Sequence, residues 1–161
     1  MRREYGRLAV VAAIALAGCA TARAPLVTAD APVIRYATAA CFGTCPVYDV
    51  TVRPDGRVTF VGERFTAVTG TREVAATPET YRRVAAAISP YRPAGERLVV
   101  PGSVDCANPP TDMPSVDLWW YDRAGERHLR FYRGCRRGNE ALAAALDAVP
   151  AALPIARLIG R

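Results

Sequence analysis

Lysine is absent from this chain of 161 residues, so arginine alone supplies its basic side-chain charge. The formal net charge is +6, and the part after residue 18 carries +4, from 18 arginines against 14 acidic residues. These arginines are interleaved with acids, as in Asp55-Gly56-Arg57, which is typical of a solvated surface. A face for an anionic ligand, such as a lipid or sugar phosphate, is the sharper alternative. Nucleic acid is not an expected partner, because no base-stacking or recognition-helix motif is present.

Catalytic signatures are also missing from the sequence. It has no Ser-His-Asp order, no nucleophile elbow and no glycine loop that would cradle a phosphate, and its one histidine is His128. Three acids, Asp105, Asp112 and Asp117, flank a long loop and could serve acid–base chemistry or bind Ca²⁺. Capping of turns explains them more simply. We therefore predict no catalytic residue, metal or cofactor, and keep Thr111, Asp112 and His128 as candidate site residues.

No apolar run is long enough to cross a membrane. The uncharged stretch 8–22 has 15 residues, whereas a spanning helix needs about 20. It follows three arginines and ends in small residues, which is the layout of a secretory signal. Residues 1–18 are predicted to be a signal peptide, and an ordinary signal that is cut after Ala22 or Ala24 is the alternative.

The run Leu16-Ala17-Gly18-Cys19 resembles the bacterial lipobox. The resemblance implies that the Cys19 thiol is joined to diacylglycerol, that the chain is cut before it, and that the new amine is acylated, so palmitate is an expected modification. Because Ala20 follows, it also implies sorting to the outer membrane, facing the periplasm. Residues 19–31, rich in Ala, Thr and Pro, are predicted to be a tether between this lipid anchor and a folded domain.

Four further cysteines form an even set, which in an oxidising compartment favours two disulfides. Of the three possible pairings, we favour Cys41 with Cys45 and Cys106 with Cys135. Gly43 permits the tight bend that the first pair needs. The chain-entropy model gives about 3–4 kcal/mol for the longer loop and about 2 kcal/mol for the shorter one, which would also be the more reducible.

The hydrophobic pattern predicts an α+β domain. Strands are expected near 33–36, 47–53, 57–62, 65–74, 97–100, 116–121 and 126–133, with a turn at Pro54-Asp55-Gly56. Helical spacing after Thr77-Pro78-Glu79 and after Asn139 predicts two helices. This order favours a mostly antiparallel sheet of two hairpins, with both helices packed on one face.

The folded domain is expected to cover residues 32–150, followed by a tail over 151–161 that Pro150 and Pro154 interrupt. Alternation places Leu118 and Trp120 on one face of the 116–121 strand and Trp119 and Tyr121 on the other, and one of these faces is expected to be core. We expect a helix or the tail to cover the remaining face, with an exposed aromatic binding surface as the alternative.

The run Cys-Phe-Gly-Thr-Cys-Pro-Val-Tyr over 41–48, the Asp-Gly hairpin and the later Thr-Asp-Met-Pro over 111–114 resemble the bacterial domain of unknown function 6438. The similarity spans roughly 33–149. It implies a fold and an exported location, and no known reaction. Cys106 and Cys135 lie outside the shared pattern and look like an added bridge.

The Cys-x-x-x-Cys-Pro spacing is also similar to the copper motif of Sco-type assembly proteins, where a distant histidine completes the site. That comparison would join Cys41 and Cys45 to His128, since thiolates and imidazole suit Cu(I). Zinc is a weaker option, because a second close cysteine pair is missing.

The sequence thus favours a membrane-anchored envelope lipoprotein with a non-enzymatic binding or scaffold domain for an envelope protein or anionic ligand. The alternative is a thiol redox or copper-handling protein.

Overall fold

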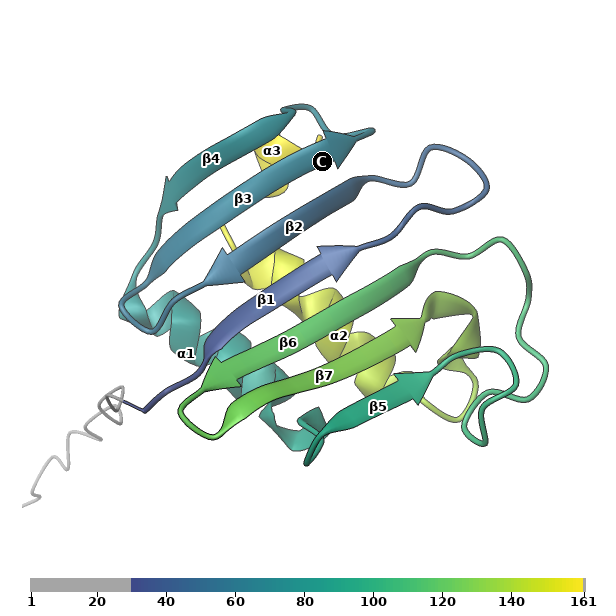
Figure 1. The fold of residues 1–161 in the computed structure, drawn as a ribbon. Helices are drawn as coiled ribbons and strands as arrows, with labels where there is room; N and C mark the ends of the chain where they lie inside the picture. Colours follow the sequence, from purple (N-terminus) through teal and green to yellow (C-terminus); the bar gives the residue numbers. More distant parts are fainter. Residues whose placement is uncertain (1–29, 161) are drawn as a thin grey trace, which may run out of the picture.

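One seven-stranded sheet organises the part of the chain that the structure, a computed structural model, describes, residues 30–160. The sheet order is β4-β3-β2-β1-β6-β7-β5 (Figure 1). The strands are β1 (Val33–Thr38), β2 (Val47–Val52), β3 (Arg57–Arg64), β4 (Gly70–Ala75), β5 (Glu96–Val99), β6 (Ser115–Asp122) and β7 (Gly125–Tyr132). The helices are α1 (Pro78–Ile88), α2 (Glu140–Ala152) and α3 (Ala156–Ile159), with short 3-10 turns η1 (Ser89–Tyr91) and η2 (Arg133–Arg136).

The α+β class is confirmed, but the predicted arrangement of two hairpins with two helices is too simple. Strand β1 pairs antiparallel with both β2 and β6, so it joins the two halves into a single sheet. Strand β5 pairs parallel with β7, because α1 carries the chain across the sheet before β5 begins. The predicted strand over 65–74 is restricted to β4, and a third helix, α3, follows α2.

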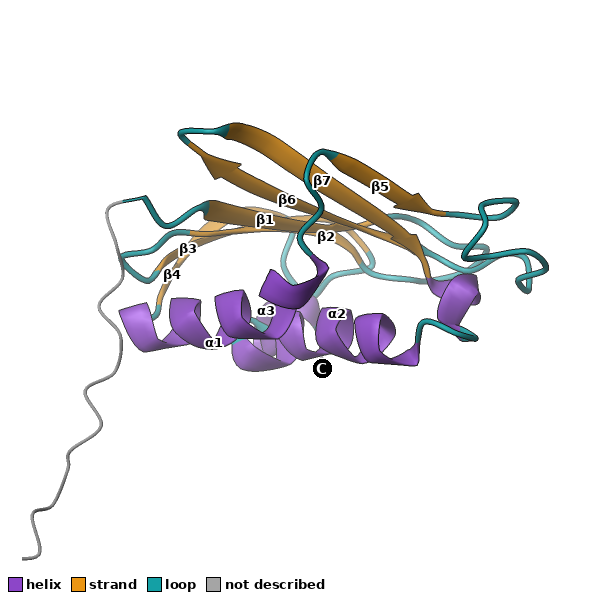
Figure 2. Cartoon of the chain, turned by 90° about the horizontal axis from the view of Figure 1, so that it is seen from below, coloured by secondary structure: helices purple, strands orange, loops and turns teal. Residues whose placement is uncertain are grey.

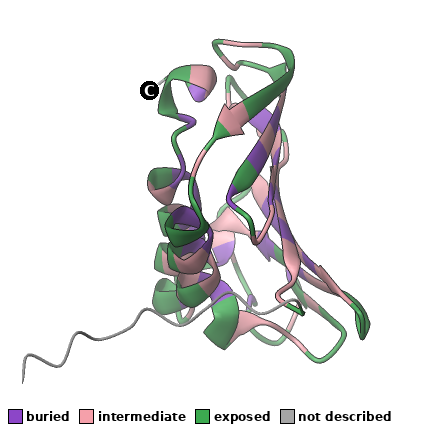
Figure 3. Cartoon of the chain, turned by 90° about the vertical axis from the view of Figure 1, so that its left-hand side faces the viewer, coloured by how far each residue is buried: buried purple, intermediate pink, exposed green. Residues whose placement is uncertain are grey.

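The three helices lie on one face of the sheet, as Figure 2 shows from below. Alternate residues of the central strands point at these helices, including Ile34, Val50, Leu118 and Trp120, and all are buried. Figure 3 shows the buried residues gathered between the two layers. The alternating apolar residues of the central strands thus form one buried face, because a strand that is covered on one side only needs one apolar side.

Helix α1 begins where the sequence predicted. The Thr77 side chain accepts a hydrogen bond from the Thr80 amide, and Pro78 occupies the first turn. Gly56 in the β2–β3 turn has φ +91, and a Cβ there would lie 2.4 Å from the Thr77 carbonyl carbon. The turn therefore requires glycine both for its backbone conformation and for its contact with the start of α1.

The C-terminal end differs from the prediction. Pro150 lies inside α2 rather than ending it, and the helix continues to Ala152, past the predicted domain boundary. Buried packing of Pro150 keeps the helical path despite the lost amide donor. Ile155 and Ile159 of the tail dock on the core, where both are buried.

The strand registers define two ends of the sheet. The chain enters β1 at the proximal end, where the buried Tyr81 hydroxyl donates a 2.7 Å hydrogen bond to the Pro32 carbonyl. Burial raises the pKa of Tyr81 to about 12. Loops 39–46, 65–69, 100–114 and 133–139 lie at the opposite, distal end (Figure 1). The start of β1, which follows the predicted tether, and the loops that contain the four disulfide-bonded cysteines are therefore at opposite ends of the domain.

Leu118 and Trp120 form the core face of β6, and the cover that the sequence predicted over the other face, which carries Trp119 and Tyr121, is not found in the described part of the chain. Both lie on the sheet face opposite the helices, and within residues 30–160 no element packs over that face (Figure 2). We call it the open face. The same described part contains no helix that is long and apolar enough for a membrane crossing.

Candidate functional site

The sequence-predicted site residues fall in two places. Cys41, Cys45, Thr111 and Asp112 lie in distal loops, whereas His128 lies in the middle of β7 on the open face. The predicted lipidation residue Cys19, the signal peptide 1–18 and the tether up to residue 29 lie outside the described residues. The candidates therefore do not form one catalytic cluster.

The first distal element is the loop that joins β1 to β2. Cys41 and Cys45 form a disulfide with an S–S distance of 1.96 Å and a Cα–Cα distance of 5.7 Å. Gly43 between them has φ +144, in the region that favours glycine, and its amide donates to the Cys41 carbonyl at 3.0 Å. Both cysteines are half-buried, and the Phe42 side chain is 89% exposed. The bridge therefore holds a large apolar side chain in water.

The second distal element is the segment Thr111-Asp112-Met113. The Phe42 amide donates a hydrogen bond to the Asp112 carbonyl at 3.3 Å, which joins the two loops. Asp112 has φ +64, and its carboxylate accepts from the Thr111 hydroxyl at 2.9 Å. The Met113 amide donates to the Tyr132 hydroxyl at 3.0 Å. We call residues 41–45 and 111–113 the tip. In the tip, the cysteine run 41–45 and the Thr-Asp-Met segment 111–113, both of which were candidates in the sequence, lie in contact.

A cavity of about 310 Å³ opens at the base of the tip. Cys45 and Pro46 form one side of it, and Pro150 of α2 lines it together with Tyr48 at the end of β2. Tyr48 belongs to a column of stacked rings, with centroid distances of 6.3 Å to Tyr36 and 5.7 Å to Phe60. The cavity thus continues the aromatic core toward solvent, directly beside the exposed tip.

An ion pair lines the same cavity, and a second arginine contacts it from outside the lining. Arg133 contacts the Asp147 carboxylate and donates to the Tyr36 hydroxyl at 3.0 Å, and Arg136 donates to Asp147 at 2.6 Å. Burial alone would raise the pKa of Asp147, but hydrogen bonds and charge from the two arginines hold it below its usual value. Arg133 and Asp147 line the cavity and pair with each other, and Arg136 adds one positive charge from outside the lining.

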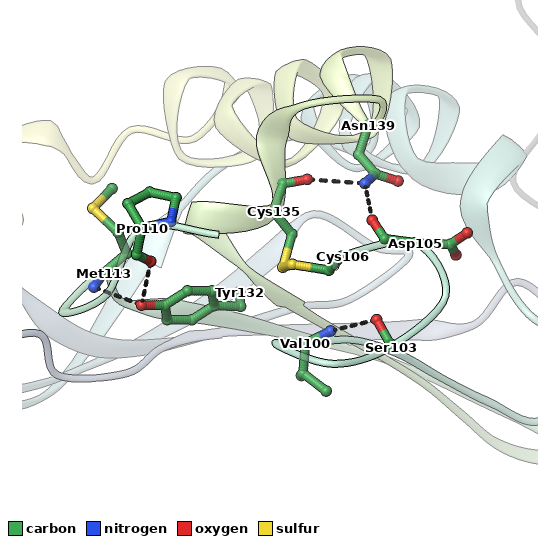
Figure 4. The surroundings of a disulfide bond; sticks show 9 residues. All are labelled: Val100, Ser103, Asp105, Cys106, Pro110, Met113, Tyr132, Cys135 and Asn139. Carbon is green, nitrogen blue, oxygen red and sulfur yellow. Dashed lines mark hydrogen bonds between the residues drawn. A yellow bond between two sulfur atoms is a disulfide. The ribbon is translucent and has the colours of Figure 1, made fainter. Parts of the chain in front are cut away.

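The second disulfide has a different setting, shown in Figure 4. Cys106 and Cys135 are only 6% and 3% exposed, and their bridge ties loop 100–114 to η2. The Asn139 side-chain amide donates to the Cys135 and Asp105 carbonyls, both at 2.9 Å, which fixes the start of α2 against the same loop. A cleft of about 520 Å³ beside this bridge is lined by residues of loops 100–114 and 133–139.

His128 takes part in a row of side chains across the open face. Its Nε2 lies 2.8 Å from an Asp117 oxygen and its Nδ1 lies 3.0 Å from a Glu96 oxygen. Its ring stacks on Trp119 at a centroid distance of 4.8 Å, and the Arg35 guanidinium lies 4.5 Å from the Trp119 ring. Both ring nitrogens and one ring face of His128 are therefore already engaged within the row.

Arg35 is fixed in turn by Asp49, whose carboxylate accepts from its Nε at 2.5 Å. Burial raises the pKa of the Asp49 carboxyl, and the Arg35 guanidinium opposes that effect only in part. The row holds mixed charges that pair with one another. It covers the middle of the open face with polar groups instead of with a second layer of structure.

The geometry bears directly on the copper interpretation. That site would need His128 beside Cys41 and Cys45, but His128 faces Asp117 and Glu96, and the two cysteines are bonded to each other. Among residues 30–160 no group of three or more His, Cys, Asp or Glu side chains is placed to hold a metal ion. A copper centre built on these three residues does not fit this arrangement.

Sequence reasoning missed the cavity and its ion pairs. Arg133 and Asp147 are 14 residues apart, on η2 and α2, and neither stands in a recognisable motif. Phe42 was noted only as part of the cysteine run. Its position between two predicted disulfide partners was the one available signal, since a five-residue closed loop has no room to bury a phenyl ring.

Comparison with protein families gives one match. The model of a family described as a domain of unknown function, DUF6438, matches residues 32–153. That range includes all seven strands, α1, the tip and the whole of α2. No curated protein matches the chain significantly.

Proposed function

We propose the following function for this chain, which belongs to the DUF6438 family: it is an envelope lipoprotein, held on a membrane through Cys19, whose domain binds another envelope component without catalysing a reaction. The single observation that supports binding is the tip. Two segments that carry the family resemblance meet there, and the disulfide holds Phe42 in solvent at 89% exposure. Exposed aromatic anchors are frequent hot spots of protein interfaces.

The rigidity of the tip favours this proposal. A flexible loop would lose conformational freedom when it binds, whereas this loop is already restrained by a disulfide and by the hydrogen bond to Asp112.

The position of the tip agrees with a lipid anchor at Cys19. The described chain begins at the proximal end, and the tip lies at the distal end (Figure 1). The 11 residues from Cys19 to Asp30 could span at most about 40 Å when fully extended. With the tether attached at the near end, the tip would point away from the anchoring membrane, toward a partner in the periplasm.

Two experiments on the full chain in a Gram-negative host test this function. Metabolic labelling with palmitate should mark the chain and should fail in the Cys19→Ala variant. A photo-reactive phenylalanine at position 42 should give discrete cross-linked adducts in intact cells. Position 65 is the matched control, because Phe65 is also exposed, at 50%, and lies in a different distal loop. An unlabelled chain, or adducts equal at both positions, would contradict the proposal.

A thiol redox function is the second candidate, and the half-exposed Cys41–Cys45 bridge is the observation that favours it. Exposed bridges in short loops are the ones that exchange with other thiols. A thiol count on protein taken from cells would decide. Two bridges that stay oxidised in mild reductant, with no copper uptake after full reduction, would reject both the redox and the copper-handling versions.

A further inference from the structure

The tip and the cavity at its base are complementary to each other on two different copies of the molecule. Phe42 projects from the outside of the 41–45 loop, while Cys45 and Pro46 of the same segment line the cavity. A two-fold symmetric contact requires one surface patch that contains both an anchor and the recess that receives it. The distal end of this domain has both within one loop.

From this juxtaposition we infer that the binding partner is a second copy of this chain, and that the two copies insert Phe42 reciprocally into each other's cavity. The inference rests on the proposed function, since it names the partner of the tip.

The size of the recess supports this assignment. A cavity of about 150 Å³ is sufficient to bind benzene in an apolar protein interior, and this one measures about 310 Å³. It therefore has room for a phenyl ring and for part of the loop that carries it. The inserted ring would lie next to Tyr48 and would lengthen the stacked column of Tyr36, Tyr48 and Phe60. Aromatic pairs of this kind contribute beyond their buried area.

Charge supports the same occupant. The tip carries Asp112 next to Phe42, whereas Arg133 and Asp147 line the cavity and Arg136, outside the lining, pairs with the same Asp147 carboxylate. In a reciprocal contact each copy would bring one acid toward this cluster, in which two arginines face one carboxylate. Complementary potentials of this kind orient partners and disfavour wrong ones.

The contact is small, because two short loops cannot bury the area of a standard interface. Free copies in dilute solution should therefore associate weakly. Copies that are held in one membrane plane meet at a much higher effective concentration, which favours weak pairs. The association should consequently be measured in vesicles or in cells, on lipid-anchored full-length chain.

Two substitutions separate the anchor from the recess. Phe42→Ala removes the anchor and keeps the cavity. Pro150→Phe fills the cavity from α2 and keeps the anchor, and Pro150→Ala is its matched control, because it removes the same proline without filling the space. Association would be read as energy transfer between C-terminally labelled copies, and circular dichroism would confirm that each variant is folded.

The wild-type chain and Pro150→Ala should both show transfer. Phe42→Ala alone and Pro150→Phe alone should weaken it by at least about tenfold, as expected for loss of a central aromatic anchor. Phe42→Ala mixed with Pro150→Phe should recover part of the transfer, since one anchor still meets one open cavity. No transfer in wild type, or a mixture no better than either variant alone, would overturn the inference. Adducts from position 42 to a different protein, without transfer, would leave the proposed function standing and reject only self-association.

Discussion

The two disulfides of this domain close loops of very different length and lie in different surroundings. Cys106–Cys135 is buried, spans 29 positions of sequence and ties the long loop to the start of α2. Cys41–Cys45 is half-exposed, spans four positions and holds Phe42 in water. The first has the setting of a bridge that stabilises the fold. The second has the setting of a bridge that presents a side chain, and the contrast can be tested by removing each in turn.

Removal of the buried bridge should have the largest effect. Cys106→Ala with Cys135→Ala should lower the free energy of unfolding by about 3–4 kcal/mol, because the unfolded chain regains the entropy of a 30-residue loop. Urea denaturation at neutral pH measures this. A loss under about 1 kcal/mol would mean that the bridge is not a stabilising one.

Removal of the tip bridge should cost less. Cys41→Ala with Cys45→Ala should lower the free energy of unfolding by about 2 kcal/mol at most, since its closed loop has only five residues. The same variant should lose most of the cross-linking from position 42, because the ring is no longer held in place. Equal stability losses in the two double variants would remove the distinction between the bridges.

The ion pairs beside the tip should contribute a smaller, pH-dependent amount. The pKa of Asp147 is lowered in the folded state, so its contribution is present above the unfolded value of about 3.8 and is lost as the pH falls through the folded pKa. Asp147→Asn should cost under about 1 kcal/mol at pH 7, given its partial exposure. Urea denaturation of both chains between pH 2 and pH 7 should show the difference shrinking toward low pH. A difference that is constant over this range would contradict the assignment.

The smallest effect on stability should come from Phe42 itself. Phe42→Ala should change the free energy of unfolding by less than about 0.5 kcal/mol, because the ring makes little contact with the domain. Phe60→Ala is the contrast, since that ring is fully buried and its loss should cost about 3–5 kcal/mol. A large stability loss at position 42 would show that its ring packs within its own domain.

Local signals predicted much of this fold. The strands β1, β2, β3, β6 and β7 follow the alternation of apolar residues, and Thr77, Pro78 and Gly56 mark a helix start and a turn through their own backbone and side-chain chemistry. The favoured cysteine pairing is also the one that the structure contains. Each of these inferences uses residues that are close in sequence or a small number of alternatives.

Long-range features were not accessible in the same way. The central place of β1, between β2 and β6, depends on pairing between residues as far apart in sequence as Ile34 and Trp120, and alternation does not specify a neighbour. Alternation did not specify which face of β6 is core, and Trp119 on the other face packs against Arg35 and His128 instead of under a helix or the tail. The cavity joins the 41–45 loop to α2, which are about 100 residues apart. The local sequence pattern of either segment does not indicate that the two will be in contact.

Stepwise reduction of the native chain most directly tests the claim that the two bridges differ in role. Folded protein would be treated with reductant of increasing strength, alkylated, and digested for mass spectrometry. We expect both bridges to persist in mild reductant and, as its strength rises, Cys41 and Cys45 to be labelled first while Cys106 and Cys135 stay bonded until the domain unfolds, because the first pair is more accessible to solvent. Labelling of both pairs together, or of the buried pair first, would contradict it.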